Sequence, residues 1–281
     1  MPEPAKATWP PQTPTPGRRP EAFFTVRCVP PEAPFAWVRA GWRDLKRSPS
    51  VSLSHGALLA MMGILLHIYF HEQPAVARGL AVTFALVAPL LLVGLQEASR
   101  RLESDLPVPF AASLSAWRSN PAGVWTFAML SALGAEVWLR VSAGIATLFF
   151  PATDSAPGPL VREVIFSQEG YEFVVVYWSA AALFGALAFA ASAVALPLLL
   201  AWRIDAMTAI RVSLCACRRN PKAMILLAAI IAALLGAGML PFYVGLVFAA
   251  PIVSHTQWHA YRDLVAVGQF PESPKGDNSA R

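Results

Sequence analysis

The sequence is short of charge, and this deficit limits where the protein can reside. Only 14% of its 281 residues are charged, whereas soluble domains carry about 25%. Hydrophobic residues make up 56% of the chain, so much of its surface must face something other than water. The net charge of +5 is not by itself a sign of nucleic-acid binding, because the position of the charges matters more than their sum. We therefore exclude an ordinary soluble domain and expect no nucleic-acid partner.

Several chemical signatures are also missing. Three cysteines are too few for a disulfide scaffold. The N-terminal sequence MPEPAKATWPPQ lacks the basic start and apolar core of a secretory signal, so the first hydrophobic run is expected to remain in the mature protein. The chain contains no Gly-rich phosphate loop, no GxSxG motif and no HExxH motif. We expect no enzymatic activity and no cofactor.

In place of charge and catalytic motifs, the sequence contains long apolar runs. A bilayer core about 30 Å thick is spanned by about 20 apolar residues in a helix. Runs of this kind lie at 52–70, 79–95, 122–149, 173–202, 223–240 and 242–257. The alternative, six buried helices of a soluble core, would leave too little polar chain to cover them. The predicted fold is therefore all-α, a polytopic membrane protein with six transmembrane helices.

Lys and Arg are distributed unevenly between the two sides of these runs. Of the 22 Lys and Arg residues, 19 fall on one side, Arg78 and Arg162 fall on the other, and Arg140 lies within the third run. Loops rich in Lys and Arg remain in the cytoplasm. We therefore predict that both termini are cytoplasmic.

A short pattern recurs before the first, third and fifth runs. The segments AGWRDLKRSP (40–49), ASLSAWRSNP (112–121) and VSLCACRRNP (212–221) share a small residue, a cation, Ser or Asn, and a final proline. A proline also recurs near the end of the second, fourth and sixth runs. This predicts three tandem repeats at about 35–105, 106–205 and 206–267, each an interfacial helix followed by a helical hairpin. The prolines that define the repeats are Pro49, Pro121, Pro221, Pro89, Pro197 and Pro251.

The first of these segments is predicted to form an amphipathic helix. Its three cations and Arg39, which comes directly before it, fall on one face, and Trp42 and Leu45 fall on another. Such a helix lies in the headgroup layer, and Ser or Asn before proline caps the membrane-crossing helix that follows. The cations either merely enforce topology or bind anionic phospholipid specifically. The candidate headgroup contacts are Arg39, Arg43, Lys46, Arg47, Arg118, Arg218 and Arg219.

Few side chains within the runs could carry chemistry. Glu136 and Arg140, four residues apart, are a candidate intramembrane ion pair, with either a structural role or a gating or substrate role. The prolines inside the second, fourth and sixth runs either bend helices for packing or free three carbonyl groups around a central cavity.

Histidines occur as two pairs at spacing four, His67/His71 and His255/His259. Such a pair can bind a metal on one helix face. The two pairs are predicted at opposite faces of the membrane, so they cannot form one site. We interpret them as polar interfacial residues and expect no metal site.

The two ends of the chain differ from the rest. Residues 1–34 are rich in proline and show no periodicity, which predicts a disordered cytoplasmic arm. Residues 268–281 are predicted to form a disordered tail, and residues 35–267 are predicted to form the transmembrane domain.

Several segments resemble one family. They are GWRDL at 41–45, PLLLVGLQEASRRLE at 89–103, AWRSNP at 116–121, RRNP at 218–221 and HTQWHAYRDLV at 255–265. They are similar to the predicted integral membrane proteins grouped as domain of unknown function 2189, over about 36–267. The resemblance implies a bacterial inner-membrane protein with six helices and brings no activity or catalytic residue. Gln96 departs from the family pattern without affecting a known role.

Three functional hypotheses remain open. The first is a non-enzymatic scaffold, assembly or lipid-interacting protein, with the bilayer, anionic phospholipid and possibly a membrane protein as partners. The second is a small-molecule or ion transporter with a pseudo-threefold cavity. The third is a haem or metal redox subunit.

Overall fold

The computed structural model describes residues 24–150, 168–240 and 242–267, and nearly all of them are helical. The helices are α1 (Ala33–Arg47), α2 (Pro49–Glu72), α3 (Pro74–Glu103), α4 (Phe110–Leu114), α5 (Pro121–Phe149), α7 (Gln168–Ser192), α8 (Ala195–Ala201), α9 (Ala206–Arg219), α10 (Pro221–Met239) and α11 (Leu246–Leu264). The other elements are the 3-10 helix η2 (Ala116–Ser119) and the strands β1 (Phe24–Val26) and β2 (Val265–Val267). The predicted all-α class is confirmed for the described residues.

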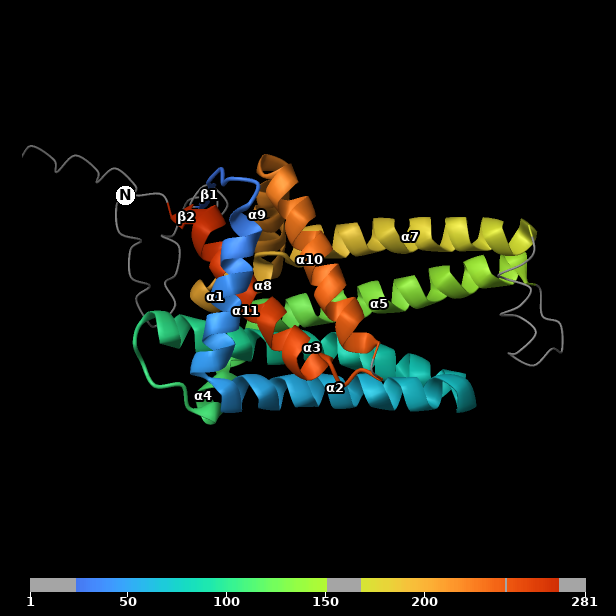
Figure 1. The fold of residues 1–281 in the computed structure, drawn as a ribbon, viewed down its shortest axis with the longest axis horizontal. Coiled ribbons are helices and arrows are strands. Elements are labelled where there is room, and N and C mark those ends of the chain that lie inside the picture. The colour runs from blue at the N-terminus through green and yellow to red at the C-terminus, as the bar shows by residue number, and fades with distance from the viewer. Residues whose placement is uncertain (1–23, 151–167, 241, 268–281) are drawn as a thin grey trace, which may run out of the picture.

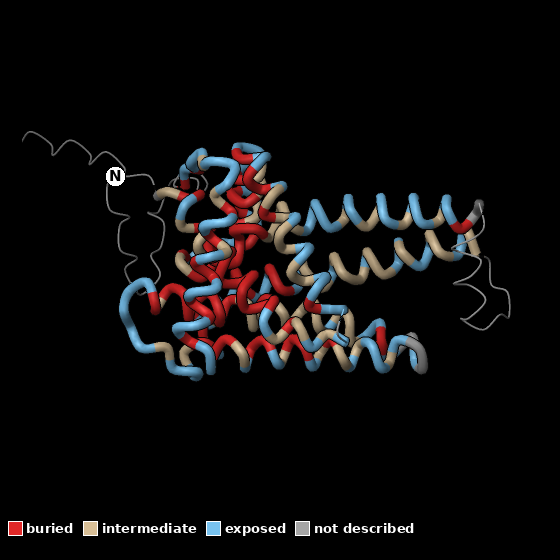
Figure 2. Tube along the Cα trace, viewed as in Figure 1, coloured by how far each residue is buried: buried red, intermediate tan, exposed pale blue. Residues whose placement is uncertain are grey.

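Four long helices, α2, α3, α5 and α7, run along the long axis of the molecule (Figure 1). At one end α1 and α9 lie across them, beside β1 and β2 (Figure 1). Buried residues concentrate at this end, whereas the far halves of α5 and α7 are mostly exposed or half-buried (Figure 2). We call it the basic end; it consists of α1, η2, α8, α9, α11, β1 and β2, the first residues of α2, α5 and α10, and the last residues of α3.

Five helical stretches among the described residues are long and apolar enough to cross a membrane. They are Pro49–Phe70, Val76–Glu103, Pro121–Phe149, Gly170–Ala201 and Pro221–Met239, so the first five predicted runs are confirmed. The sixth predicted run, 242–257, is not among them, because its apolar part is short and polar residues follow at 254–257. It lies in α11, most of which is buried, as is typical of an apolar stretch of this length inside a folded domain.

α2, α5 and α10 begin at the prolines that the sequence marks out. Pro49, Pro121 and Pro221 each occupy the first turn of their helix. Proline is favoured there because the N–H that it lacks would have no partner within the helix. The prolines therefore set the points where the chain leaves the basic end and enters the long apolar helices.

The residues before two of these prolines also hold distant turns. Asn120 donates from Nδ2 to the carbonyl groups of Leu199, near the end of α8, and of Trp202 and Ile204 in the turn after it, at 2.8 Å in the case of Ile204. Asn220 donates to the Arg27 carbonyl at 2.9 Å and accepts the Val29 N–H at 2.8 Å. These buried amides satisfy backbone groups that would otherwise lose their hydrogen bonds in the interior.

The two ends of the described chain lie together. β1 pairs antiparallel with β2, with Thr25 opposite Ala266, and the Arg219 guanidinium donates to the Val26 carbonyl at 2.9 Å. The predicted disordered arm is therefore wrong from Phe24 onward, because its partners come from the opposite end of the chain and leave no mark on local composition. Residues 1–23 and the predicted tail 268–281 lie outside the described residues.

α11 forms the centre of the basic end and packs against α1, α2, α3 and α10. Glycines on two neighbours permit close approach. A Cβ at Gly41 of α1 would lie 2.8 Å from Thr256 Oγ1, and a Cβ at Gly56 of α2 would overlap the backbone carbonyl of Val247. The backbones of α1 and α2 therefore rest almost directly on α11.

Candidate functional site

The seven candidate headgroup contacts are all exposed at the basic end. They are Arg39, Arg43, Lys46 and Arg47 on α1, Arg118 on η2, and Arg218 and Arg219 on α9. The Lys46 ammonium lies 5.1 Å from the centre of the Trp42 ring, and the Arg118 guanidinium lies 5.4 Å from that of Trp117. Cations held over aromatic rings in this way combine a charge with a surface that favours the membrane interface.

The apolar side of α1 contacts protein rather than being left open for lipid. Trp37, Ala40 and Leu45 are buried, and α1 packs against α11. Trp37 Nε1 donates to Asp263 at 2.6 Å, whereas Trp42 is 41% exposed. The prediction that Leu45 faces the membrane is therefore wrong. The α1 cations are carried by a helix that is fixed in the folded domain.

A set of hydrogen-bonded polar side chains lies inside the basic end and joins α1, α2, α3 and α11. We call it the polar ring; its members are Asp44, Ser48, Ser52, Ser99 and His255, all buried. His255 Nδ1 lies 2.7 Å from Ser99 Oγ, and Nε2 lies 3.0 Å from Ser52 Oγ. Ser52 and Ser48 hydroxyls are 3.3 Å apart, and Ser48 donates to the Asp44 carbonyl at 3.0 Å. These bonds link Ser99 to Asp44 through His255, Ser52 and Ser48.

Asp44 connects the polar ring to the protein surface. Its Oδ2 lies 2.8 Å from Nε2 of His259, whose side chain is 25% exposed. Burial of the carboxyl opposes its ionisation, but hydrogen bonds from His259 and Ser99 and the nearby imidazole charges outweigh burial. They lower the pKa of Asp44 below its ordinary value of 3.8. Asp44 is therefore a buried carboxylate that is bonded to the partly exposed side chain of His259.

Further buried polar atoms lie near the ring without hydrogen bonds. His55 Nδ1 bonds the Val51 carbonyl at 3.0 Å, but its Nε2 has no hydrogen-bond partner among the described residues. The same holds for both amide atoms of Gln96 and for Gln257 Oε1. Buried polar atoms without partners are rare and costly, so their concentration on α2, α3 and α11 marks this interior as unusual.

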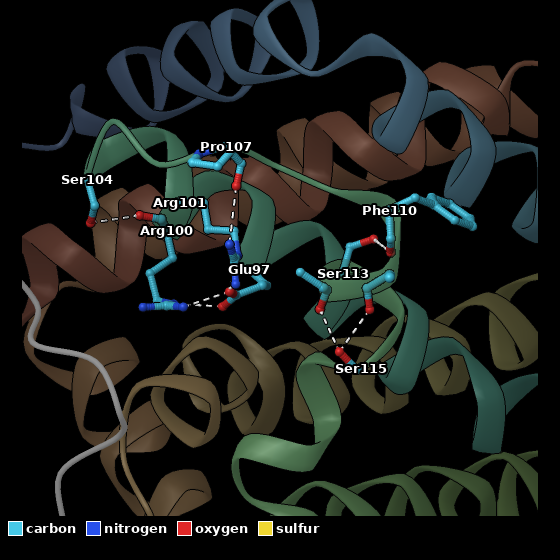
Figure 3. Close-up of polar contacts among 10 residues, drawn as sticks. Glu97, Arg100, Arg101, Ser104, Pro107, Phe110, Ser113 and Ser115 are labelled. Carbon is cyan, nitrogen blue, oxygen red and sulfur yellow. Dashed lines mark hydrogen bonds and ion pairs between the residues drawn. The ribbon is translucent and has the colours of Figure 1, made fainter.

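A second buried carboxylate, Glu97 on α3, is neutralised by two neighbours on the same helix (Figure 3). Arg100 donates to both Glu97 oxygens, at 2.7 and 2.6 Å, and Arg101 donates to one of them at 2.7 Å. Arg101 also donates to the Pro107 carbonyl at 3.2 Å. This group therefore fixes the connection that leads from α3 to α4.

The members of the two predicted histidine pairs lie in different surroundings. His255 is fully buried, so the interfacial interpretation is wrong for it, and His259 bonds Asp44 instead of sharing a ligand with it. At the far end of α2, the His67 ring lies 5.8 Å from that of Tyr243. The side chain of His71 lies outside the described residues. Within the described ranges, no three His, Cys, Asp or Glu side chains form a group that could hold a metal ion.

The other predicted positions lie apart from the ring. Arg140 and Glu136 form an ion pair on α5, with 2.7 Å between Nη2 and Oε1, and the Arg140 side chain is 74% exposed. Pro89 and Pro251 lie inside α3 and α11, Pro197 lies in α8, and all three are buried.

The sequence analysis missed most of the polar ring. It treated Gln96 as a departure without consequence and singled out neither Asp44 nor Ser99. One signal was available, because Ser48, Ser52 and His55 recur at helical spacing at the start of a mainly apolar helix.

Residues 76–201, from the beginning of α3 to the end of α8, match the model of the family described as predicted integral membrane protein (DUF2189). The match confirms the resemblance seen in the sequence over these residues, which include the segments at 89–103 and 116–121. No curated protein and no solved structure matches the chain.

Proposed function

We propose that this chain, which over residues 76–201 is similar to the predicted integral membrane proteins that carry the domain of unknown function 2189, is a non-enzymatic scaffold that binds anionic phospholipid at its basic end. The observation that carries the proposal is the exposure of all seven candidate cations on helices that are anchored in one folded domain. Fixed cations lose less conformational freedom on binding than cations on flexible loops, so each headgroup contact is stronger.

The topology that we propose places this surface at the cytoplasmic face of a bacterial inner membrane. Three tandem units of interfacial helix and hairpin would cross the membrane six times, with α11 returning the chain. The pairing of β1 with β2 supports an even number of crossings, because it brings both ends of the described chain to one side. The excess of Lys and Arg on that side supports a cytoplasmic location.

A membrane-protein partner is part of the same proposal. Large apolar side chains on α7 are exposed, among them Trp178, Leu183 and Leu187. Another membrane protein could cover this surface within the bilayer without contacting the basic end.

The lipid contact can be tested with two single-charge variants. Arg43→Gln removes an exposed cation from α1. Arg78→Gln removes an exposed cation from the end of α3 that lies far from the basic end. Purified protein is titrated with phosphatidylglycerol or phosphatidylcholine, and bound lipid is counted by native mass spectrometry. Because one cation near an anionic surface contributes about 1 kcal/mol, Arg43→Gln should weaken phosphatidylglycerol binding about fivefold.

Arg78→Gln should leave phosphatidylglycerol binding unchanged, and neither variant should alter phosphatidylcholine binding. Equal effects of the two variants on phosphatidylglycerol would refute a specific surface at the basic end. Wild-type protein that copurifies from native membranes with neither lipid nor a partner protein would also contradict the scaffold proposal.

The polar ring favours a second candidate function, a transporter of an ion or small polar molecule. Its residues face one another across four helices, as a transport site requires, although they lie at the basic end rather than around a central threefold axis. If vesicles reconstituted with the protein are no more permeable to ions, protons and small polar solutes than vesicles without it, this candidate is eliminated.

A further inference from the structure

Three segments lie at the basic end (Figure 1) and share one pattern of burial. They are α1, the stretch from α4 through η2, and α9, and each ends two residues before the proline that begins a long apolar helix. Counted back from that proline, the residues at positions eight, five and one are buried in all three segments. These residues are Gly41, Asp44 and Ser48 in the first, Ser113, Ala116 and Asn120 in the second, and Ser213, Ala216 and Asn220 in the third. The three segments therefore turn corresponding positions toward the protein interior.

Corresponding positions also point outward. Three residues before the proline each segment has an exposed cation, and seven residues before it each has an apolar side chain at least partly open to the surroundings. The cations are Lys46, Arg118 and Arg218, and the apolar residues are Trp42, Leu114 and Leu214. Trp42 and Leu114 are 41% and 43% exposed, and Leu214 is half-buried. In α1 and α9, residues four apart lie on one face of the helix, so the cation and the apolar side chain form a pair.

The position of these pairs fits an anionic phospholipid. Each cation lies three residues before a stretch that is long and apolar enough to cross a membrane, so it lies where the phosphate groups of a bilayer begin. No carboxylate among the described residues pairs with any of the three cations, so their charge is available to a ligand. The apolar neighbour suits acyl chains at the boundary of the headgroup layer. An anion without acyl chains would use the cation alone.

We propose that the three segments are three equivalent binding sites, each for one anionic phospholipid, with the phosphate on the cation and an acyl chain beside the apolar residue. The inference rests on the proposed lipid binding and extends it, because it fixes the number of lipids and gives the apolar residues a role. The buried residue before each proline holds its segment in place. Asn120 and Asn220 bond the backbone of distant turns, and Ser48 belongs to the polar ring. The sites are therefore formed before lipid arrives, which lowers the cost of ordering them on binding.

The test counts the lipids bound to the full-length protein by native mass spectrometry, as phosphatidylglycerol is titrated against a fixed excess of phosphatidylcholine. The wild type should bind three phosphatidylglycerol molecules in preference to phosphatidylcholine. Lys46→Gln, Arg118→Gln and Arg218→Gln should each weaken one of the three binding steps about fivefold, the effect of losing one cation near an anionic headgroup, and leave the other two unchanged. The triple variant should weaken all three steps. Glycerol 3-phosphate, which carries the charge without acyl chains, should not displace the bound lipid.

Arg27→Gln is the matched control, because Arg27 is an exposed cation at the same end of the molecule that lies outside the three segments. It should leave all three binding steps unchanged. Three results would overturn this inference while the wild type still prefers phosphatidylglycerol: a number of bound lipids other than three, equal effects of Arg27→Gln and the three single variants, or displacement by glycerol 3-phosphate. A wild type without preference for phosphatidylglycerol would overturn the proposed lipid binding as well.

Discussion

Gly56 tests whether α11 is truly the close-packed centre of the basic end. A Cβ built at this position of α2 would overlap the Val247 carbonyl oxygen, and it would lie 2.7 Å from the carbonyl carbon and 2.9 Å from the Cα of the same residue. All three atoms belong to the backbone of α11, so no side chain can rotate away. Gly56→Ala must therefore push α2 and α11 apart.

The size of the effect can be worked out from what the separation disturbs. Overpacking a rigid contact costs about 3 kcal/mol at the upper end of its usual range, and weakening the Ser52–His255 hydrogen bond adds about 1 kcal/mol. Replacing glycine by alanine inside a helix returns about 1 kcal/mol of helix propensity. We expect Gly56→Ala to lower the free energy of unfolding by about 3 kcal/mol.

Gly185→Ala supplies the matched comparison. Gly185 also lies inside a long helix, α7, but a Cβ there would meet no atom within 4 Å. This variant should gain up to about 1 kcal/mol of stability from helix propensity alone. Both variants are unfolded by titration with sodium dodecyl sulfate in mixed micelles, with tryptophan fluorescence as the signal. The reasoning is refuted if Gly56→Ala proves as stable as the wild type or as Gly185→Ala.

Three other outcomes can be checked on the same protein. Because the pKa of Asp44 is lowered, its contribution to stability is present above about pH 4 and is lost as the pH falls through the lowered pKa; Asp44→Asn should flatten the acid side of a profile of thermal stability against pH. Asn220→Ala should lower the free energy of unfolding by about 1–2 kcal/mol in the detergent titration, since it leaves partly buried backbone groups without hydrogen bonds. Burial raises the pKa of Cys217 to about 11, so maleimide should label it much more slowly than the exposed Cys215; equal rates by peptide mapping would contradict this.

Features that depend on neighbouring residues were predictable from the sequence. Pro49, Pro121 and Pro221 fix helix starts because the geometry of proline suits the first turn wherever it occurs. The exposed cations of α1 were predictable for the same reason, since helical spacing alone places them on one face.

Features that depend on residues far apart in the sequence could not be predicted. β1 was assigned to a disordered arm because its partner, β2, begins at Val265. The polar ring was missed because His255 bonds Ser52 and Ser99, which lie far earlier in the chain. A histidine in an apolar run gives no indication of which helices will surround it, so spacing within one helix could not distinguish an interfacial residue from a buried one.

The polarity of α11 and its place in the fold explain each other. A helix that carries Ser254, His255, Thr256 and Gln257 in succession cannot expose all its faces to lipid, because unpaired polar groups are costly there. Burial among α1, α2 and α3 supplies hydrogen bonds to several of these side chains, and Gly41 and Gly56 let the surrounding helices come close enough. The same burial fixes α1, and thereby holds its cations in place at the surface. The proposed lipid contacts outside and the hydrogen bonds of the polar ring inside therefore share one structural element, so a variant that loosens α11 should weaken both, whereas Arg43→Gln should weaken lipid binding alone.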